Sequence, residues 1–514
     1  MANSRVAGVT IPLFSIRTRR DWGIGQITDL PACAAWIQRA GHRLLQLLPV
    51  HELAGGETSP YGARTAFGLD PIYVGLEAVP DLDAAAIDEA LGDEGRRTLE
   101  RVRGEPRVDY PAVRAIKEKV LARGFERFYA REWKKDTARA GQLRAFVDEQ
   151  KAWAADLALY VALRERRAGY GWESWPAAER DRDPRTMAEA KKELELPILS
   201  HQYAQWILHT QWNRAQGELR AMGVELMGDL PFIIGGESAD VWSRRGQFRQ
   251  DVSLGAPPDA FSEDGQDWGL PAYNWAAMDA DDLSWLRART RHAASLYDRF
   301  RLDHVIGYFR QYVKPHGAKR GTFDPPGEPA QLVRGERVMR AMQEEAKGAR
   351  IIAEDLGVIP PFARETLTKL AIPGYRVIPW EKDDGKGFRD PHHYPVVSVA
   401  TWSTHDTAPI SGWWDELPEG DRQELARMAH LPPNVSDGER SVALLGLLYA
   451  SSSELTLSLA AELLGQKDRI NTPGTVDATN WTYRLPMALE DLEKHAGVNE
   501  RLDRIRELVK ASGR

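Results

Sequence analysis

Three carboxylates follow short apolar runs at wide spacing along the chain. They are Asp303 in RLDH, Glu354 in AEDLG and Asp406 in STHD, separated by 51 and 52 residues. Retaining glycoside chemistry needs two carboxyl groups in different environments, one to attack the anomeric carbon and one, held protonated, to give its proton to the departing oxygen. The three residues are therefore candidates for such a pair and for a third acidic contact.

Two neighbours of these carboxylates strengthen the hypothesis, although each motif alone has an ordinary alternative. Arg301 precedes Asp303 by two residues on the same strand face, so its charge is expected to keep that carboxylate ionised. An R-x-D pair is nevertheless often a plain ion pair. In the same way Glu354 can belong to a solvated loop or helix start, and His405 beside Asp406 can be a structural histidine. Their co-occurrence favours a catalytic interpretation.

The segment 255–275, GAPPDAFSEDGQDWGLPAYNW, holds four aromatic residues among Gly, Pro and Asp. Its irregularity predicts a long loop, and long ordered loops in compact domains are commonly functional. Aromatic rings among carboxylates suit sugar rings, whose C–H faces stack and whose hydroxyls hydrogen-bond. An Ω-loop that packs on itself is the structural alternative. Residues 59–75, SPYGARTAFGLDPIYVG, have similar character and are predicted to form another wall of the same cleft.

Short apolar runs that end in polar residues alternate with helical stretches through most of the chain. The runs are VELMGDLPFII, DRFRLDHV, RIIAEDLGV, GYRVIPWE and VVSVATWSTHD. This alternation predicts an α/β fold with a parallel sheet covered on both faces. A (β/α)8 TIM barrel is favoured over a doubly wound sheet because the candidate catalytic groups come from many strand ends, which in a barrel meet at one face.

Other stretches complete this outline. A helix is predicted to open at Thr28 or Asp29, with Pro31 in its first turn, and to run to Gly41 before the strand LLQLLPV. From about 85 to 220 the charged, helix-periodic pattern predicts a helical insertion. We therefore expect a single catalytic barrel over 1–514 with inserted helical subdomains and an active-site loop insertion at about 250–280.

Composition excludes several classes of function. The 75 acidic and 68 basic residues are well mixed and give a net charge of −7, so no basic face for nucleic acid is expected. Cys33 is the single cysteine and cannot form an intramolecular disulfide. The first residues lack a secretory signal pattern, and no window is apolar enough for a membrane span. A cytoplasmic protein without membrane or nucleic-acid partners is expected.

Taken together, the motifs resemble a known family, the 4-α-glucanotransferases called amylomaltases or disproportionating enzymes. The matching segments run in family order from about residue 8 to 487. They are WGIGQITDL, SPYGARTAFGLDPIYV, GDLPFIIGGESADVW, GAPPDAFSEDGQDWGLPAYNW, RLDHVIGYF, IIAEDLGVI, THDT followed by GWW, and NTPGTVDATNWTYRL. The family fold is a (β/α)8 barrel with inserted subdomains, which agrees with the outline above.

The resemblance implies an activity and roles for particular residues. The implied activity is transfer of α-1,4-glucan segments between malto-oligosaccharides, maltose or glucose, with glycogen or starch-like glucans as further substrates, and without a cofactor or metal. Asp303 would be the nucleophile, Glu354 the general acid and then base, and Asp406 the carboxylate that grips substrate hydroxyls. Further substrate-binding or supporting positions would be Tyr61, Asp229, Asp259, Phe261, Trp268, Arg301, His304 and His405.

Two departures and two rival functions accompany the resemblance. Many relatives have Tyr where this chain has Ala260, and the segment after the nucleophile reads GYFRQY instead of the commoner form with Trp. These differences concern the preferred glucan length. An α-glucan hydrolase of the amylase type would share the barrel and a similar triad, and a non-catalytic glucan-binding scaffold would share the cleft. A transferase is distinguished because it redistributes chain lengths without creating new reducing ends.

Overall fold

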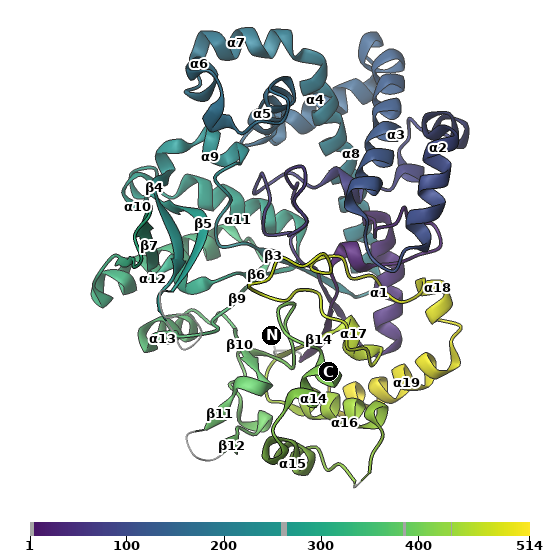
Figure 1. Cartoon of the computed structure of the whole chain (residues 1–514), viewed down its shortest axis with the longest axis vertical. Helices are drawn as coiled ribbons and strands as arrows, with labels where there is room; N and C mark the ends of the chain where they lie inside the picture. The colour runs from purple at the N-terminus through teal and green to yellow at the C-terminus, as the bar shows by residue number, and fades with distance from the viewer. Residues whose placement is uncertain (1–4, 259–264, 384–386, 433) are drawn as a thin grey trace.

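The computed structural model describes residues 5–258, 265–383, 387–432 and 434–514. Within these ranges, parallel strands close into a barrel in which neighbours around the wall follow one another along the chain. In chain order they are β1 (Val6–Thr10), β2 (Leu44–Gln46), β3 (Glu225–Leu230), β6 (Arg299–Leu302), β9 (Arg350–Ala353), β10 (Gly374–Val377), β13 (Ser398–Thr401) and β14 (Leu455–Leu459). β1 pairs with both β2 and β14, which closes the barrel (Figure 1).

Side chains inside the barrel change from apolar to polar toward the carboxyl ends of the strands. A buried cluster that includes Leu44, Met227, Ile352 and Val399 fills the interior. Successive side chains of a strand alternate between faces, so the residue two positions further on points the same way. At those positions stand Gln46, Asp229, Glu354 and Thr401. The alternation therefore places polar groups at one end of a barrel whose other end is apolar.

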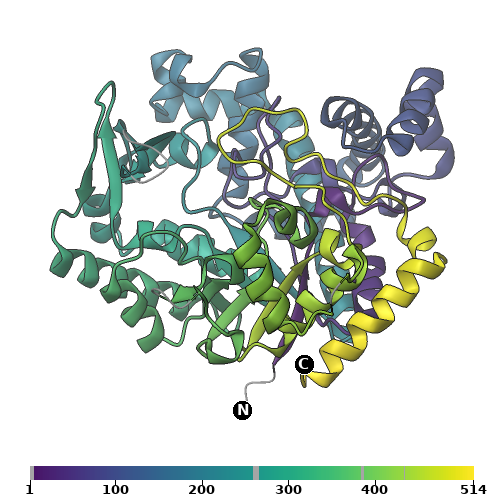
Figure 2. The same ribbon diagram turned by 60° about the horizontal axis from the view of Figure 1, so that its bottom comes forward.

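Helices cover the outside of the barrel in a ring. They are α1 (Leu30–Arg39), α8 (Glu195–Ala221), α11 (Ser284–Leu296), α12 (Glu328–Glu345), α13 (Pro361–Lys369), α16 (Asp437–Ala450) and α19 (Ala496–Ala511). Shorter helices lie in the connections: α9 (Ala239–Ser243), α10 (Trp275–Ala280), α14 (Ile410–Glu416), α15 (Glu419–Met428), α17 (Ala460–Leu463) and α18 (Leu489–Leu492). α19 contacts both α1 and α16, so the last helix closes the ring against the first (Figure 2).

Most of the predicted elements are present. The five predicted apolar runs contain β3, β6, β9, β10 and β13, and the predicted helix near residue 30 is α1, with Pro31 in its first turn. β1 and β14 were not predicted. Both are short and completely buried, reading VAGVT and LTLSL, and neither contains the charged residues that mark the predicted runs.

The connection between β2 and β3 carries a group of helices, which we call the helical region. Its members after β2 are α2 (Ala84–Gly104), α3 (Tyr110–Arg131), α4 (Ala138–Glu149), α5 (Ala154–Arg166), α6 (Ala177–Arg180) and α7 (Pro184–Glu193), followed by α8. The region lies beyond the β2 and β3 side of the barrel (Figure 1). Its α2–α3 connection pairs with the late segment of the chain, because Arg107 forms a β-bridge with Tyr483.

A second, antiparallel sheet stands beside the barrel. It contains β4 (Phe248–Ala256), β5 (Gln266–Tyr273), β7 (Gln311–Pro315) and β8 (Thr322–Asp324), in the order β5-β4-β7-β8 (Figure 1). The sequence prediction of an irregular loop over 255–275 was therefore wrong for much of this segment. Gly and Pro masked the strand pattern, and the pairing of β4 with β5 is itself irregular, with register shifts on both sides of Leu254. A further short hairpin joins β11 (Lys382–Asp383) and β12 (Gly387–Phe388).

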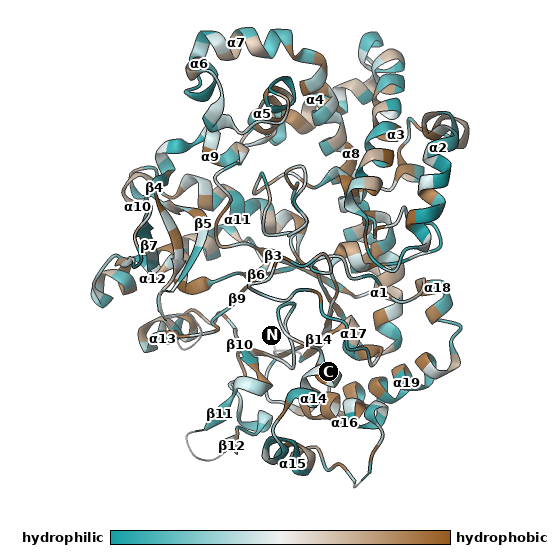
Figure 3. Cartoon of the chain, in the orientation of Figure 1, coloured by the Kyte–Doolittle hydropathy of each residue, from teal (hydrophilic) through white to brown (hydrophobic). Residues whose placement is uncertain are grey.

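Hydropathy follows this arrangement. Brown, apolar positions gather along the barrel strands and the inner sides of the helices, and teal positions dominate the outlying turns of α2 and α15 (Figure 3). Every helix in the described part of the chain is too short or too polar to cross a lipid bilayer.

Candidate active site

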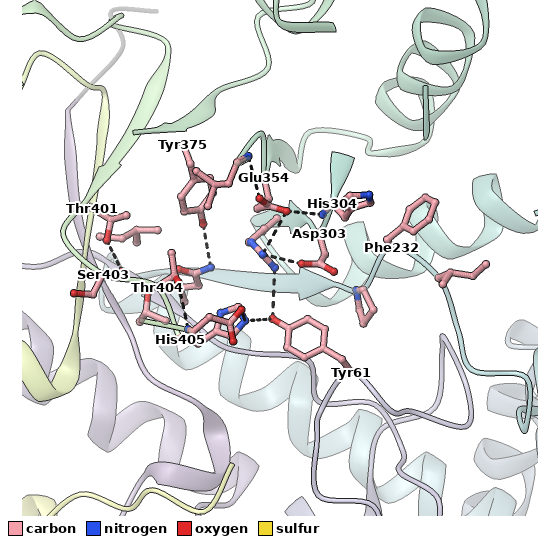
Figure 4. Close-up of a pocket in the computed structure, with 18 of the residues that line it drawn as sticks. Tyr61, Phe232, Asp303, His304, Glu354, Tyr375, Thr401, Ser403, Thr404 and His405 are labelled. Carbon is pink, nitrogen blue, oxygen red and sulfur yellow. Dashed lines mark hydrogen bonds and ion pairs between the residues drawn. The ribbon is translucent and has the colours of Figure 1, made fainter. Parts of the chain in front are cut away.

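A cavity of about 400 Å³ opens at the carboxyl ends of the barrel strands. Small-molecule sites usually measure about 300–1,000 Å³, so this volume is sufficient for a ligand. Residues from several strand ends and from β5 line it, among them Thr10, Gln46, Trp268, Asp303, Glu354, Tyr375, Thr401 and Asp406. Figure 4 shows Asp303, Glu354, Tyr375 and Thr401 converging on this cavity from different strand ends. The structure thus brings the three predicted catalytic carboxylates into one site.

Arg301 lies on the floor of this cavity between acidic groups. Its Nη2 is 2.7 Å from Asp303 Oδ1 and 3.9 Å from Glu354 Oε2. The predicted pairing of Arg301 with Asp303 is therefore present. Because one nitrogen approaches both carboxylates, these two oxygens cannot be further apart than the sum of the two distances. The guanidinium is almost completely buried, which strengthens its attraction for both groups.

Glu354, directly after β9, accepts hydrogen bonds from two backbone amides. The His304 N–H donates to Oε2 at 2.7 Å and the Leu356 N–H to Oε1 at 3.0 Å. His304 has a φ of 45°, a left-handed conformation that is uncommon outside glycine and that turns the chain sharply after β6. Removal from water, opposed by Arg301 and assisted by Asp303, raises the pKa of Glu354 to about 7.

The surroundings of Asp406 favour its ionised form, whereas those of Glu354 favour the protonated form. His405 Nε2 lies 3.1 Å from its Oδ2, and Asn471 Nδ2 donates to its Oδ1 at 2.6 Å. Burial works against ionisation, but the charge and hydrogen bond of His405, followed by the Asn471 bond, lower the pKa of Asp406 to about 2. Burial likewise opposes the charge on His405, and Asp406 outweighs it and raises the pKa of the imidazole. The two side chains form a charged pair.

Tyr61 connects this pair to Arg301. Its hydroxyl donates to Asp229 Oδ2 at 2.8 Å and lies 3.1 Å from His405 Nε2 (Figure 4). The rings of Tyr61 and His405 are stacked, with centroids 5.3 Å apart. The predicted cleft wall over 59–75 therefore reaches the cavity through Tyr61.

The family resemblance implies a substrate-binding or supporting role for Asp229, and its contacts here are with other residues of the site. Its side chain is completely buried beneath the cavity and is absent from the described residues that line it. Arg301 Nη1 contacts its two oxygens at 2.7 and 2.8 Å. Asp229 lies in β3, and its register partner in the neighbouring strand β6 is Arg301. It holds Arg301 and Tyr61 instead of facing the cavity.

Trp268 on β5 forms a wall of the cavity above His304. Their ring centroids are 5.0 Å apart and the rings are nearly perpendicular. Trp268 Nε1 donates to Gln266 Oε1 at 3.0 Å, which fixes the indole on its own strand. The other two predicted positions of this segment, Asp259 and Phe261, lie outside the described residues.

Several polar residues of the site were not predicted, among them Tyr375, Gln46 and Asn471. Tyr375 and Gln46 line the cavity, and the Gln46 Nε2 lies 3.4 Å from the Tyr375 hydroxyl. Asn471 holds Asp406 from the segment between α17 and α18. Gln46 is a polar residue at the end of an apolar strand, the same pattern that led to the predicted carboxylates, so the sequence could have identified it. No local pattern distinguishes Asn471, because its role arises only from tertiary contact.

The arrangement can do acid–base and nucleophilic chemistry. Asp303 lies beside a guanidinium, Glu354 exchanges its proton near neutral pH, and Asp406 is an anion held by its neighbours. Carboxyl groups whose environments separate their protonation states are the usual basis for dividing the roles of acid and nucleophile. In the described part of the chain, no three His, Cys, Asp or Glu side chains are grouped to hold a metal ion.

Comparison with known proteins agrees with this chemistry. The family model described as 4-alpha-glucanotransferase matches residues 11–490. The chain belongs to this family. A 4-α-glucanotransferase of Chlamydia pneumoniae is 30% identical over 512 residues, which cover 97% of this chain and 94% of that protein. The 4-α-glucanotransferase of Thermus thermophilus is 29% identical, with 88% of this chain and 89% of the relative covered.

Solved structures show the same fold. The amylomaltase of Streptococcus agalactiae, determined in complex with acarbose, has a TM-score of 0.84 at 24% identity, with 99% of each chain covered. The amylomaltase of Corynebacterium glutamicum has a TM-score of 0.82 at 23% identity, with 98% of this chain and 75% of that chain covered. These structures confirm the predicted (β/α)8 barrel. The family match and the relatives confirm the predicted 4-α-glucanotransferase activity. The amylase-type hydrolase has no comparable support.

Proposed function

We propose that this member of the 4-α-glucanotransferase family transfers α-1,4-glucan segments between malto-oligosaccharides by a retaining double displacement. The observation that carries the proposal is the approach of one Arg301 nitrogen to both Asp303 and Glu354. The sum of the two distances limits the separation of the carboxylate oxygens to the lower edge of the roughly 6.5–9.5 Å that inverting enzymes need for a water molecule. A close pair favours retention.

In the first step Asp303 is the nucleophile. One of its carboxylate oxygens bonds to the anomeric carbon of the donor sugar while the bond from that carbon to the bridging oxygen breaks. Glu354, which retains its proton up to a pH near 7, transfers that proton to the departing oxygen. The products are a β-glucosyl ester on Asp303 and a released fragment with a free 4-hydroxyl.

In the second step Glu354 is the base. It takes the proton from the 4-hydroxyl of an incoming sugar, whose oxygen bonds to the anomeric carbon as the ester bond to Asp303 breaks. Both displacements invert the same carbon, so the α configuration is retained. Arg301 compensates the charge that returns to Asp303, since its Nη2 lies 2.7 Å from the carboxylate.

The remaining residues are assigned to the substrate. Asp406, held as an anion by His405 and Asn471, is proposed to accept hydrogen bonds from hydroxyls of the sugar that reacts. Trp268 offers an aromatic face to a neighbouring glucose. Asp259 and Phe261 keep the roles that the family resemblance implies for them. Asp229 is assigned to holding Arg301 and Tyr61 in place.

The organisation and location of the protein are part of the proposal. We assign 1–514 to one catalytic barrel unit that carries a helical insertion over about 85–220 and an active-site insertion over about 250–280. Maltose, glucose and glycogen or starch-like glucans are further candidate substrates. A cytoplasmic location is supported by Cys33, a single buried thiol that a reducing compartment would leave unmodified.

The deciding experiment is incubation with maltotriose, following free glucose, longer oligosaccharides and total reducing ends over time. A ladder of longer products at constant reducing ends is expected for a transferase. Rising reducing ends without longer products would assign a hydrolase instead. No change with maltotriose, and none with maltose plus glycogen, would contradict catalysis and favour a glucan-binding scaffold. The α or β configuration of the newly formed glycosidic bond, observed through its anomeric proton by NMR, tests retention.

A further inference from the structure

Behind the cavity wall lies Trp481, in the segment 466–485 that connects α17 with α18. Its ring centroid is 5.8 Å from that of Tyr61 and 5.9 Å from that of His405. Among the described residues, Trp481 is not part of the cavity lining, whereas both of its partners are. Figures 1 and 2 show this late segment running beside the early loop that follows β2. The indole therefore supports two stacked rings from behind.

The backbone of Trp481 adopts an unusual conformation that its surroundings maintain. Its φ is 62°, in the left-handed region that a bulky residue rarely occupies. Its N–H donates to the Ile470 carbonyl at 2.8 Å, and its own carbonyl accepts a 2.8 Å hydrogen bond from the Tyr110 hydroxyl. Such conformations persist where neighbouring contacts determine them, and they are concentrated at functional sites.

Tyr110 is the first residue of α3, so the contact comes from the helical region. Arg114 and Lys117 follow it four and seven positions later, on the same face of the helix. Arg114 donates to both oxygens of the fully buried Asp70 at 3.0 Å. Lys117 Nζ donates to two backbone carbonyls of residues 72 and 74 at 2.6 and 2.8 Å.

These contacts fix the loop that carries Tyr61. Asp70 also accepts from the Leu53 N–H at 3.0 Å and from the Ile72 N–H at 3.0 Å, so it ties the chain just before the predicted cleft wall to the last part of that wall. One face of α3 therefore holds the Tyr61 loop through Asp70 and the Trp481 segment through Tyr110. The two segments meet where the rings of Tyr61 and Trp481 pack.

We propose that Trp481 is a positioning residue for glucan transfer, and that α3 sets it through Tyr110. Trp481 holds the Tyr61–His405 stack, and His405 in turn lies 3.1 Å from Asp406. When the indole is absent, His405 gains freedom to move, and Asp406 loses the partner that keeps it ionised and oriented. Tyr110, on one face of α3, then acts on the site through Trp481. This inference rests on the function proposed above.

The charged groups around His405 determine how loss of the Trp481 ring should change the pH dependence of activity. Asp406 and Asp229 favour its positive charge, and Arg301 opposes it. Tyr61 contacts its Nε2, and Arg469 approaches the backbone oxygen of Asp406 at 3.4 Å. Because Asp406 is the anion in direct contact with the imidazole, displacement of His405 is expected to let Asp406 bind a proton at a higher pH.

The test compares Trp481→Ala, Trp481→Phe and Tyr110→Phe with Tyr129→Phe as the matched control. Tyr129 lies on the same helix, and its hydroxyl makes no hydrogen bond within the described residues. For Trp481→Ala we expect kcat/KM with maltotriose to fall about 10- to 100-fold, as when reacting groups are displaced by a fraction of an ångström to 1 Å. Tyr110→Phe should lose about threefold to tenfold, the equivalent of one hydrogen bond.

Two further observations separate positioning from general damage. The acid limb of the kcat/KM profile should move to higher pH in Trp481→Ala, whereas a variant that merely contains less folded enzyme loses rate equally at every pH. Trp481→Phe, which keeps an aromatic ring, should recover most of the activity. Tyr129→Phe should stay within about twofold of wild type.

The inference fails if folded Trp481→Ala keeps the wild-type kcat/KM and pH profile. If that variant does not fold, Tyr110→Phe becomes the deciding test, because it leaves the indole in place. A Tyr110→Phe variant as active as Tyr129→Phe would overturn the role of α3. Wild-type enzyme is assayed first. A wild type that forms no ladder from maltotriose contradicts the proposed function, whereas a normal wild type with normal variants contradicts only the present inference.

Discussion

Glu354 and Asp406 are both buried carboxyl groups, and their surroundings move their proton affinities in opposite directions. Glu354 accepts hydrogen bonds from two backbone amides. It also lies 3.9 Å from the Arg301 guanidinium, which already forms ion pairs with Asp303 and Asp229. Asp406 has a histidine and an amide of its own. The cost of burying a charge therefore raises the pKa of Glu354, whereas the neighbours of Asp406 outweigh that cost and lower its pKa. One site thus contains an acid and an anion made from the same functional group.

Replacement of Asp303 by Asn should abolish turnover while leaving the fold intact. The amide keeps the shape of the side chain but cannot form the glucosyl ester, so kcat should fall at least about 1,000-fold. Release of glucose from maltotriose measures the effect, and the melting temperature checks the fold. Asp88→Asn, on the exposed surface of α2, is the control. A variant that retains a tenth of wild-type activity would remove Asp303 from its proposed role.

Glu354→Gln should change the pH dependence of stability as well as activity. The pKa of Glu354 is raised to about 7 in the folded protein, from about 4.5 when unfolded. Between these values the unfolded chain has lost the proton and the folded chain has kept it, so stability falls as pH rises through this window. The neutral amide avoids the loss, which is of order 3 kcal/mol at pH 8.

Melting curves at pH 4.5 and pH 8 test this prediction. The difference between Glu354→Gln and wild type should favour the variant more at pH 8 than at pH 4.5. Glu100→Gln, an exposed position on α2, should show no such dependence. Equal differences at both pH values would mean that Glu354 is ionised in the folded protein near neutrality, and the acid role would then need another residue.

Among individual residues, the sequence predicted those whose partners are close along the chain. Arg301, Asp303 and His304 are nearly consecutive, and His405 adjoins Asp406, so local spacing was informative. Asn471 reaches Asp406 across 65 residues and was not predicted. The burial of Asp229 beneath Arg301 depends on the pairing of β3 with β6, which no local pattern reveals.

At the scale of elements, the β4–β5 hairpin converts an irregular sequence into a cavity wall. Trp268 lies on β5 against His304, and β4 pairs with β7 on its other side. A wall built on paired strands holds its aromatic face more rigidly than a free loop would. Sugar-stacking residues then need little ordering when the substrate binds.

Trp268→Ala tests this wall. Loss of an aromatic stack typically costs about 1–3 kcal/mol at other binding sites, so kcat/KM for malto-oligosaccharides should fall by about 5- to 150-fold. Trp133→Ala is the matched control, since Trp133 lies just after α3 and outside the cavity lining. An unchanged kcat/KM in Trp268→Ala would assign the indole to structure and not to substrate.

Elements were predictable where they carried a contrast between apolar and polar ends. The strands found from sequence have polar residues such as Gln46, Asp229 or Glu354 at or just after their carboxyl ends, whereas β1 and β14 are buried throughout and look like ordinary core segments. β5 was missed for the opposite reason. Its Gly and Pro suggest a loop, and only its pairing with β4 makes it a strand.

At the scale of the whole molecule, early and late parts of the chain are joined through a buried ion pair. Arg484 Nη2 donates to both oxygens of Asp21 at 3.0 and 2.9 Å, and the two side chains are 0% and 1% exposed. Arg484 Nη1 also donates to the carbonyls of Val102 and Glu105 at 3.0 and 2.8 Å. The Arg484 side chain therefore joins three parts of the chain: the β1–β2 connection that holds Asp21, the helical region, and its own segment between α17 and α18.

Arg484→Met should destabilise the fold strongly, because it leaves Asp21 charged and buried without its partner. Removal of one member of a buried pair typically costs about 3–5 kcal/mol. Thermal and guanidinium unfolding measure the loss. The double variant Asp21→Asn with Arg484→Met should recover part of it, since the orphaned charge is gone. A double variant no more stable than Arg484→Met alone would show that the carbonyl contacts matter more than the pair.

Closure of the barrel was predicted from the convergence of candidate residues and not from any strand pattern. The argument succeeded because polar ends of parallel strands must share one face. The sequence held no information on the seam itself, since neither strand of the β1–β14 pair had been recognised.

That seam has a consequence for how the protein is made. Val6 pairs with Leu455, so the first strand of the barrel cannot find one of its neighbours until the chain is nearly complete. A ribosome adds roughly 5–20 residues per second, and β1 therefore waits about 20 to 90 seconds with one edge unpaired. An exposed strand edge invites pairing with other chains. Nascent chains of this enzyme are thus most vulnerable to aggregation during synthesis, and most dependent on cellular chaperones then.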